Sequence, residues 1–243
     1  MIEIDLEPKV TVSYDMSNED YHAHPGISAS GLKLMLKSYK LYKLRQRMKR
    51  IESPALTMGT ILHERLLENK YRVPLLSDAN IDKLDIMTHN GRLMFDYILR
   101  YTVNEVSVII EDDSYGITRK VRVDAYDKTN GIVYDLKTTR YNDPRKFEAD
   151  AYRLGYHIQA AWYLDTMNMA GLPAKAFGFL VVPSESPNEP FAYQVTQDLI
   201  EDGRAAYSEL IDGYLEYEKS GSDAVSFLTM DLPNWRRDQL GIL

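Results

Sequence analysis

Two aspartates and one lysine lie close together in two adjacent stretches of strand-like sequence. Asp124 belongs to VRVDAY, and Asp135 and Lys137 belong to VYDLKTT. Because side chains alternate along a strand, Asp135 and Lys137 share one face, and Asp124 reaches that face if the two stretches pair as a hairpin. Carboxylates bind Mg²⁺ readily, and a nearby ammonium can orient a metal-bound water or stabilise developing charge. The grouping therefore predicts a site for phosphodiester hydrolysis.

An acid followed two positions later by a lysine is also common on edge strands, so the neighbouring motifs must decide between the two interpretations. GTILHERLLE, in an expected helix over about residues 56–69, carries Gly59 and His63 one turn apart. The missing side chain of Gly59 would permit the close approach of another element. A histidine flanked by leucines is more often a packing or capping residue. Only Gly59 and the later aspartates and lysine favour a metal-binding role for His63.

A third motif lies on the long amphipathic helix that we expect from Pro144 to about residue 169. Tyr156, Gln159 and Tyr163 fall at positions i, i+3 and i+7 of this helix, so they share one stripe. These three side chains could support the site or contact DNA. Packing between the helix and the sheet is the alternative explanation.

The remaining periodicities predict the elements that position these motifs. Residues 101–139 have three strand-like stretches separated by the turn-rich segments DDSYG and DKTNG, which indicates an antiparallel meander. A buried strand follows at about 174–183, then a short strand in FAYQVT and a helix over about 197–218. Two further helices precede the meander. We therefore expect an α/β fold with a mixed central β-sheet flanked by helices.

Composition limits the class of protein. A chain of 243 residues with 44% hydrophobic content fits one domain over 1–243, and the absence of cysteine excludes disulfides, thiol nucleophiles and iron–sulfur clusters. No stretch reaches the roughly 18 consecutive apolar residues of a membrane span, and the first residues are acidic. We expect a cytoplasmic protein without a membrane partner.

Charge is unevenly distributed along the chain. The formal net charge is −7, yet residues 28–50 contain eight Lys or Arg and no acid, which leaves 21 basic and 36 acidic residues elsewhere. Successive cations on a helix can follow a phosphate backbone without reading bases, although a solvated helix face is the plainer alternative. The predicted DNA-binding residues of this segment are Lys33, Lys37, Lys40, Lys43 and Arg47.

The motifs together resemble the RecB/RecE-like group of PD-(D/E)XK nucleases. Asp124, Asp135 and Lys137 match its D-x₁₀-D-x-K arrangement, and the G-x-x-x-H and Q-x-x-x-Y motifs occur in the same order along the chain. YHAHPGISASGLKLMLKS is similar to the opening segment of the exonuclease VIII-type family, so the resemblance covers about residues 21–193. Val123 replaces the proline that names the superfamily, and an aspartate replaces the more frequent glutamate as second acid. Both departures occur in the wider group.

The resemblance implies an αβββαβ core and a set of roles. The implied metal site consists of His63, Asp124, Asp135 and Leu136, holding Mg²⁺ or alternatively Mn²⁺, with Lys137 as the lysine that orients water. An acid on the preceding strand should join the site, and both Glu105 and Glu111 are candidates.

The resemblance also implies a function. It predicts an exonuclease that digests linear duplex DNA from 5′ to 3′ and leaves 3′ single strands for recombination in a bacterial cell, encoded by a phage or prophage. Expected partners are double-stranded DNA ends, further copies of the chain and a single-strand annealing protein. Residues 197–243 are expected to form a helical extension that could serve oligomerisation. The alternatives are a structure-specific endonuclease, a defence nuclease, or a non-catalytic DNA-binding protein of the same fold.

Overall fold

A mixed six-stranded sheet forms the centre of the computed structural model, which describes residues 10–48, 53–72 and 75–221. The strands lie in chain order across the sheet: β1 (Val10–Ser13), β2 (Val103–Asp112), β3 (Ile117–Asp127), β4 (Ile132–Thr139), β5 (Ala176–Pro183) and β6 (Phe191–Gln194). Only the β4–β5 pair is parallel; the other neighbouring strands pair antiparallel. The expected α/β class with a mixed central sheet is confirmed.

Turn chemistry explains the meander of β2, β3 and β4. Gly116 and Gly131 follow the turn segments DDSY and DKTN, and both have positive φ, 65° and 69°, which side-chain-bearing residues rarely adopt. The Asp127 carboxylate closes the second turn by accepting hydrogen bonds from the backbone of Thr129 and Asn130. Because β5 runs parallel to β4, the chain must cross over between them, and two helices make that crossover.

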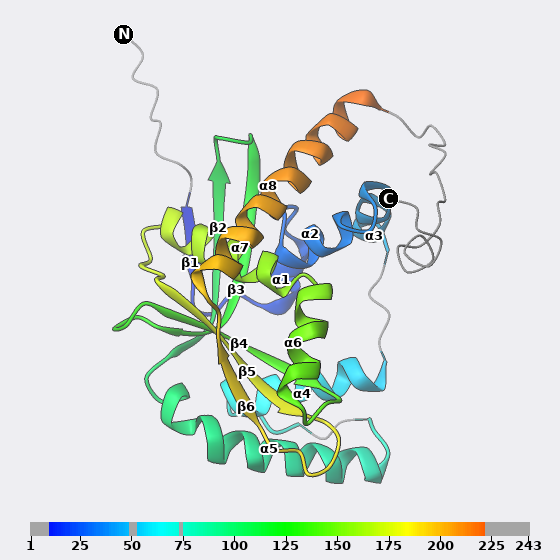
Figure 1. Ribbon diagram of the computed structural model, residues 1–243, viewed down its shortest axis with the longest axis vertical. Coiled ribbons are helices and arrows are strands. Elements are labelled where there is room, and N and C mark those ends of the chain that lie inside the picture. The colour runs from blue at the N-terminus through cyan, green and yellow to red at the C-terminus, as the bar shows by residue number, and fades with distance from the viewer. Residues whose placement is uncertain (1–9, 49–52, 73–74, 222–243) are drawn as a thin grey trace, which may run out of the picture.

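Helices cover both faces of the sheet (Figure 1). The elements on one face include α2 (Ala29–Met35), α3 (Tyr39–Gln46), α6 (Pro144–Arg153), α7 (Tyr156–Met169) and α8 (Gln197–Ser220). The opposite face is covered by α4 (Pro54–Leu67) and α5 (Asp78–Leu99), while the short α1 (Asn18–Ala23) precedes α2. None of the described helices is long and apolar enough to cross a membrane.

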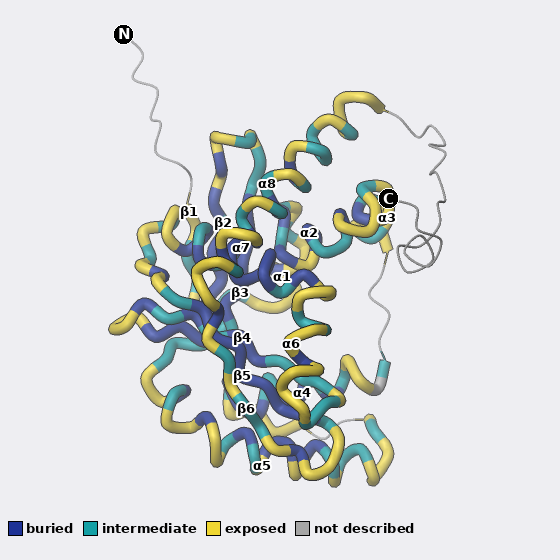
Figure 2. Tube along the Cα trace, viewed as in Figure 1, coloured by how far each residue is buried: buried dark blue, intermediate teal, exposed yellow. Residues whose placement is uncertain are grey.

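Each face of the sheet has its own hydrophobic core. Trp162 and Ile158 of α7 pack with Val121 and Val123 of β3 in the larger core. In the second core, α4 and α5 pack against Leu136 of β4 and neighbouring residues of β5. Figure 2 shows that the buried positions concentrate in the central strands and α7. The sheet is therefore buried on both faces, as the crossover topology requires.

Two of the expected helices are broken. The predicted helix over 144–169 is two helices, because Gly155 between them has a φ of 71°, and a Cβ there would lie only 3.2 Å from side-chain atoms of Leu36 and Lys33. The predicted basic helix over 28–50 is also two, α2 and α3, since the Ser38 side chain caps a new helix by accepting a hydrogen bond from the Leu41 amide. The strand β1 and the helix α5 had not been predicted.

The expected C-terminal extension over 197–243 is only partly within the described residues. Its first part is α8, which packs along α7. Residues 222–243 lie outside the described part of the chain.

Candidate active site

The site lies where β3 and β4 separate. Along these strands the pairs are Ala125 with Tyr134, Tyr126 with Val133, and Asp127 with Ile132, whereas β4 pairs with β5 along its whole length. Asp124 comes just before the first residue of β3 that pairs with β4, and Asp135 comes just after the last residue of β4 that pairs with β3. The Leu136 amide at the fork donates a hydrogen bond to Asp124 Oδ2, over 2.7 Å. The carboxylate thus replaces a strand partner and keeps the fork open.

His63 reaches the fork from α4. Its Nε2 lies 2.9 Å from the carbonyl oxygen of Leu136, and its Nδ1 lies 3.6 Å from Asp124 Oδ2. Because a carbonyl only accepts, Nε2 carries the hydrogen in this contact. Leu136 therefore contributes both of its backbone polar groups to the site, its amide to Asp124 and its carbonyl to His63.

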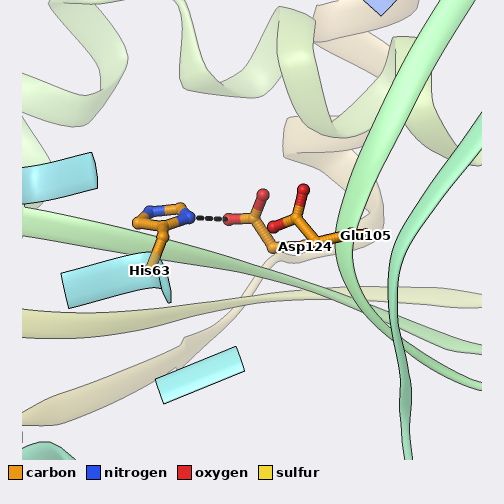
Figure 3. Close-up of side chains that lie close together, drawn as sticks. All are labelled: His63, Glu105 and Asp124. Atoms are coloured by element: carbon orange, nitrogen blue, oxygen red, sulfur yellow. Dashed lines mark ion pairs between the residues drawn. The ribbon is translucent and has the colours of Figure 1, made fainter. Parts of the chain in front are cut away.

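Glu105 completes a cluster of acidic and imidazole groups. It lies on β2 between Asn104 and Val106, whose partners on β3 flank Asp124. Single ligand atoms of His63, Glu105 and Asp124 all lie within 4.8 Å of one another (Figure 3). Glu111, the other candidate on this strand, is exposed and lies across from Thr118. The structure therefore brings Glu105 to the site and leaves Glu111 away from it.

The two clustered carboxyl groups are held in an environment that disfavours their charge. Burial raises the pKa of Asp124 to about 6, with Asp135 adding to the rise and His63 opposing it. Burial, and then the charges of Asp124 and Glu68, raise the pKa of Glu105 to about 8. A bound cation would favour the charged forms of both groups. Two carboxylates, one imidazole and one backbone carbonyl form a donor set that suits Mg²⁺ or Mn²⁺, so the residues fit such an ion.

Asp135 and Lys137 face the opposite core from Leu136, as strand alternation predicted. Lys137 Nζ forms an ion pair with Asp135 Oδ2, and Gln159 Nε2 donates to Asp135 Oδ1 over 2.5 Å. Burial acts to lower the pKa of Lys137, but the neighbouring Asp135, Tyr156 and Asp124 outweigh it and raise the pKa overall. Lys137 is therefore present as an ammonium beside the carboxylates.

The three predicted residues of α7 line the same cavity as the fork. Tyr156, Gln159 and Tyr163 contribute to a cavity of about 970 Å³ together with His63, Glu105, Asp124 and Asp135. Burial raises the pKa of both tyrosines, so their hydroxyls stay protonated. The Nζ atoms of Lys33 and Lys137 lie 5.0 Å and 4.9 Å from the centre of the Tyr156 ring.

The basic residues of segment 28–50 do not all lie on one surface, as a single phosphate-binding helix would require. Lys33 reaches into the cavity, where its Nζ donates to Gln159 Oε1 over 2.9 Å. Lys43 pairs with Glu218 of α8 at 2.7 Å, while Lys37, Lys40 and Arg47 lie on the exposed surface. DNA binding by this segment stays a prediction.

Some details of the cavity had not been predicted. Arg122, two positions before Asp124 on β3, lines the cavity with its Nε 4.0 Å from Glu105 Oε2. Its position two residues before Asp124 was a usable signal, because strand alternation predicts one face for both side chains. The expected reason for Gly59 does not hold, since a Cβ there would meet Thr138 Oγ1 at an ordinary 3.7 Å.

A forked mixed sheet that presents two aspartates and a lysine defines the PD-(D/E)XK class of α/β domain. The model of a family described as a PDDEXK-like domain of unknown function, DUF3799, matches residues 86–226, more than half of the chain. The chain belongs to this family, which confirms the PD-(D/E)XK resemblance.

Comparisons with individual proteins show the fold alone. No curated protein matches the chain. A Eubacterium rectale protein named as a candidate exonuclease is 16% identical with a TM-score of 0.62, over 93% of this chain and 98% of that chain. A phage-related exonuclease from Haemophilus somnus 129PT is 13% identical with a TM-score of 0.40, over 82% and 97% of the two chains. An alkaline exonuclease from Laribacter hongkongensis is 12% identical with a TM-score of 0.39, over 81% and 92%.

Proposed function

We propose that this protein is a metal-dependent deoxyribonuclease that hydrolyses phosphodiester bonds at the ends of linear duplex DNA. The observation that carries the proposal is the convergence at one fork of the His63, Glu105 and Asp124 cluster with the Asp135–Lys137 ion pair. Phosphodiester hydrolysis needs a metal ion held by oxygen ligands, and a nearby ammonium can stabilise the charge that develops.

The site residues divide into two groups by role. His63, Glu105, Asp124, Asp135 and the carbonyl of Leu136 would hold the ion. Bound there, Mg²⁺ or Mn²⁺ would polarise the scissile phosphate and lower the pKa of an attacking water.

The remaining side chains act on water and on each other. Lys137, fixed by its ion pair with Asp135, orients the water and stabilises charge that develops on the phosphate. Gln159 holds the Asp135 carboxylate through its amide nitrogen. Tyr156 and Tyr163 form one wall of the cavity that receives the DNA backbone.

The direction of digestion and the pathway are the finer part of the proposal. Similarity of residues 21–193 to the exonuclease VIII-type family supports digestion from 5′ to 3′, with 3′ single strands passed to recombination and to an annealing protein. The E. rectale protein that shares the fold is named as a candidate exonuclease. The same similarity supports a phage or prophage origin and a homo-oligomer.

The decisive experiment is digestion of a linear duplex labelled at either the 5′ or the 3′ end, with a covalently closed circle alongside. Wild type, Asp135→Asn and Lys137→Met are compared with and without Mg²⁺, and Lys146→Met, a change of an exposed lysine on α6, is the matched control. We expect metal-dependent loss of label from the 5′ ends, an intact circle, full activity in the control and no activity in the two site variants.

Other outcomes identify the alternatives. Cutting of the circle would indicate an endonuclease, such as a structure-specific or defence enzyme. DNA binding without cleavage of any substrate would indicate a non-catalytic protein of the same fold and would overturn the proposal. Comparing Glu105→Gln with Glu111→Gln tests the place of Glu105, because the two carboxyls lie on the same strand and only Glu105 lies at the fork.

A further inference from the structure

A chain of polar contacts connects α2 to the fork. Lys33 Nζ donates to Gln159 Oε1 over 2.9 Å, Gln159 Nε2 donates to Asp135 Oδ1 over 2.5 Å, and Asp135 pairs with Lys137. Lys33 is 126 positions away from Gln159 in the sequence, so the contact exists only because the fold brings α2 against α7.

The chemistry of these groups fixes the orientation of the Gln159 amide. A carboxylate only accepts hydrogen bonds, whereas an amide has one donating and one accepting end. Asp135 therefore selects the amide nitrogen, which leaves the amide oxygen to accept from Lys33. Burial lowers the pKa of Lys33 to about 7, and its Nζ can donate this hydrogen bond in either protonation state.

The environment of Lys33 directs its ammonium group to this contact. A Cβ at Gly155, at the break between α6 and α7, would lie only 3.2 Å from Lys33 Cγ, so the aliphatic stem runs close against the backbone there. The ammonium lies above the Tyr156 ring at the end of that stem. Gln159 is only 4% exposed, and an amide oxygen left without a partner in such a place would be costly.

We propose that Lys33 is a positioning residue, which holds the Gln159 amide in one orientation and thereby holds the Asp135 carboxylate toward the fork. The inference rests on the proposed nuclease function. It gives Lys33 a role different from that of a lysine that follows the phosphate backbone.

A double-mutant cycle separates the two roles. Lys33→Met and Gln159→Leu are made singly and together, with Lys33→Arg as the conservative variant and Lys146→Met as the exposed control. If Lys33 acts through Gln159, each single change lowers kcat roughly 10- to 100-fold, as is typical for groups that orient a metal ligand. KM for the DNA is then unchanged, the double variant is no slower than Gln159→Leu, and Lys33→Arg recovers part of the activity.

Two results would overturn the proposal. If the effects of the single changes multiply in the double variant, Lys33 acts independently of Gln159. If Lys33→Met raises KM and leaves kcat unchanged, Lys33 contacts the DNA itself.

A readout that needs no activity distinguishes failure of this inference from failure of the proposed function. The side-chain ¹⁵N–H₂ resonances of Gln159 should shift, and their hydrogens should exchange faster, in Lys33→Met but not in Lys146→Met. If the wild type neither cleaves DNA nor binds Mn²⁺ in calorimetry, the nuclease proposal fails, yet the resonances still decide whether Lys33 holds the amide. Unchanged resonances in Lys33→Met would refute the positioning role.

Discussion

Replacing the Asp124 carboxylate at the fork by a neutral group should stabilise the metal-free protein, because burial disfavours the charged form. Burial raises the pKa of Asp124 from 3.8 to about 6. At 1.36 kcal/mol for each pKa unit, ionised Asp124 destabilises the folded state by about 3 kcal/mol. In Asp124→Asn the amide oxygen can still accept the Leu136 N–H, so the variant loses the charge and keeps the hydrogen bond.

The gain has a definite dependence on pH. Below about pH 4 the Asp124 carboxyl is protonated in both the folded and the unfolded chain, so the substitution changes little. Between pH 4 and pH 6 the unfolded chain releases the proton first, and the stability of the wild type falls as pH rises. Above pH 6 the full difference of about 3 kcal/mol is present, which for a chain of this size corresponds to a rise in Tm of roughly 6 to 12 °C.

The assay is unfolding of wild type and Asp124→Asn in EDTA at pH 4.5 and pH 8, repeated with Mg²⁺. Without metal we expect the variant to gain about 1 kcal/mol at pH 4.5 and about 3 kcal/mol at pH 8, and Mg²⁺ to stabilise the wild type but not the variant. Equal stabilities at pH 8, or the same gain at both pH values, would refute the conclusion that burial disfavours the charged form of Asp124.

Three further predictions concern the surroundings of the site. Gly203→Ala should destabilise the protein by about 3 kcal/mol in urea unfolding, because the new Cβ would lie 2.3 Å from the backbone oxygen of His157, where α7 and α8 pack together. The control is Gly59→Ala, which should not destabilise the protein, since the nearest neighbour of its new Cβ is at 3.7 Å. Tyr207→Phe removes the 2.7 Å hydrogen bond to Asp165 between the same two helices and should lower the free energy of unfolding by about 1.5 kcal/mol; an unchanged denaturation midpoint would mean that Arg204 alone satisfies Asp165. Neutralising Lys40, Lys43 and Arg47 together should weaken DNA binding and flatten its salt dependence in fluorescence titrations; if neither changes, α3 is not the DNA surface.

The sequence was enough to predict the site residues whose positions depend on one element or on two adjacent elements. Asp124, Asp135 and Lys137 lie on two strands joined by a tight turn, so strand alternation and hairpin pairing were enough to bring them together. The α7 stripe was predicted by helical periodicity, and all three of its residues line the cavity. In each case the geometry is decided within one or two elements.

Residues whose positions depend on tertiary register could not be predicted. Glu105 and Glu111 are separated by an even number of positions, so alternation assigns them to the same face, and only the pairing of β2 with β3 distinguishes them. The contact between Lys33 and Gln159 joins residues 126 positions apart, and no local rule indicates it.

Breaks and omissions in the predicted helices also have physical reasons. Gly155 was compatible with a continuous helix, and nothing local in the sequence indicates its left-handed backbone, with a φ of 71°. The buried face of α5 includes Thr88 and Gly91 between its apolar residues, which weakened the hydrophobic pattern that would have revealed the helix.

Part of the site at the fork of β3 and β4 consists of main-chain groups, which side-chain substitutions do not remove. Leu136 contributes through its amide and its carbonyl, and every one of the other nineteen genetically encoded side chains except proline would leave both groups in place. A library of point variants would therefore record this position as a core leucine, sensitive only to the packing of its side chain. Replacing its amide by an ester through chemical ligation would remove the N–H and leave the side chain intact. Backbone chemistry of this kind is the appropriate tool wherever separated strands leave main-chain groups to form a site.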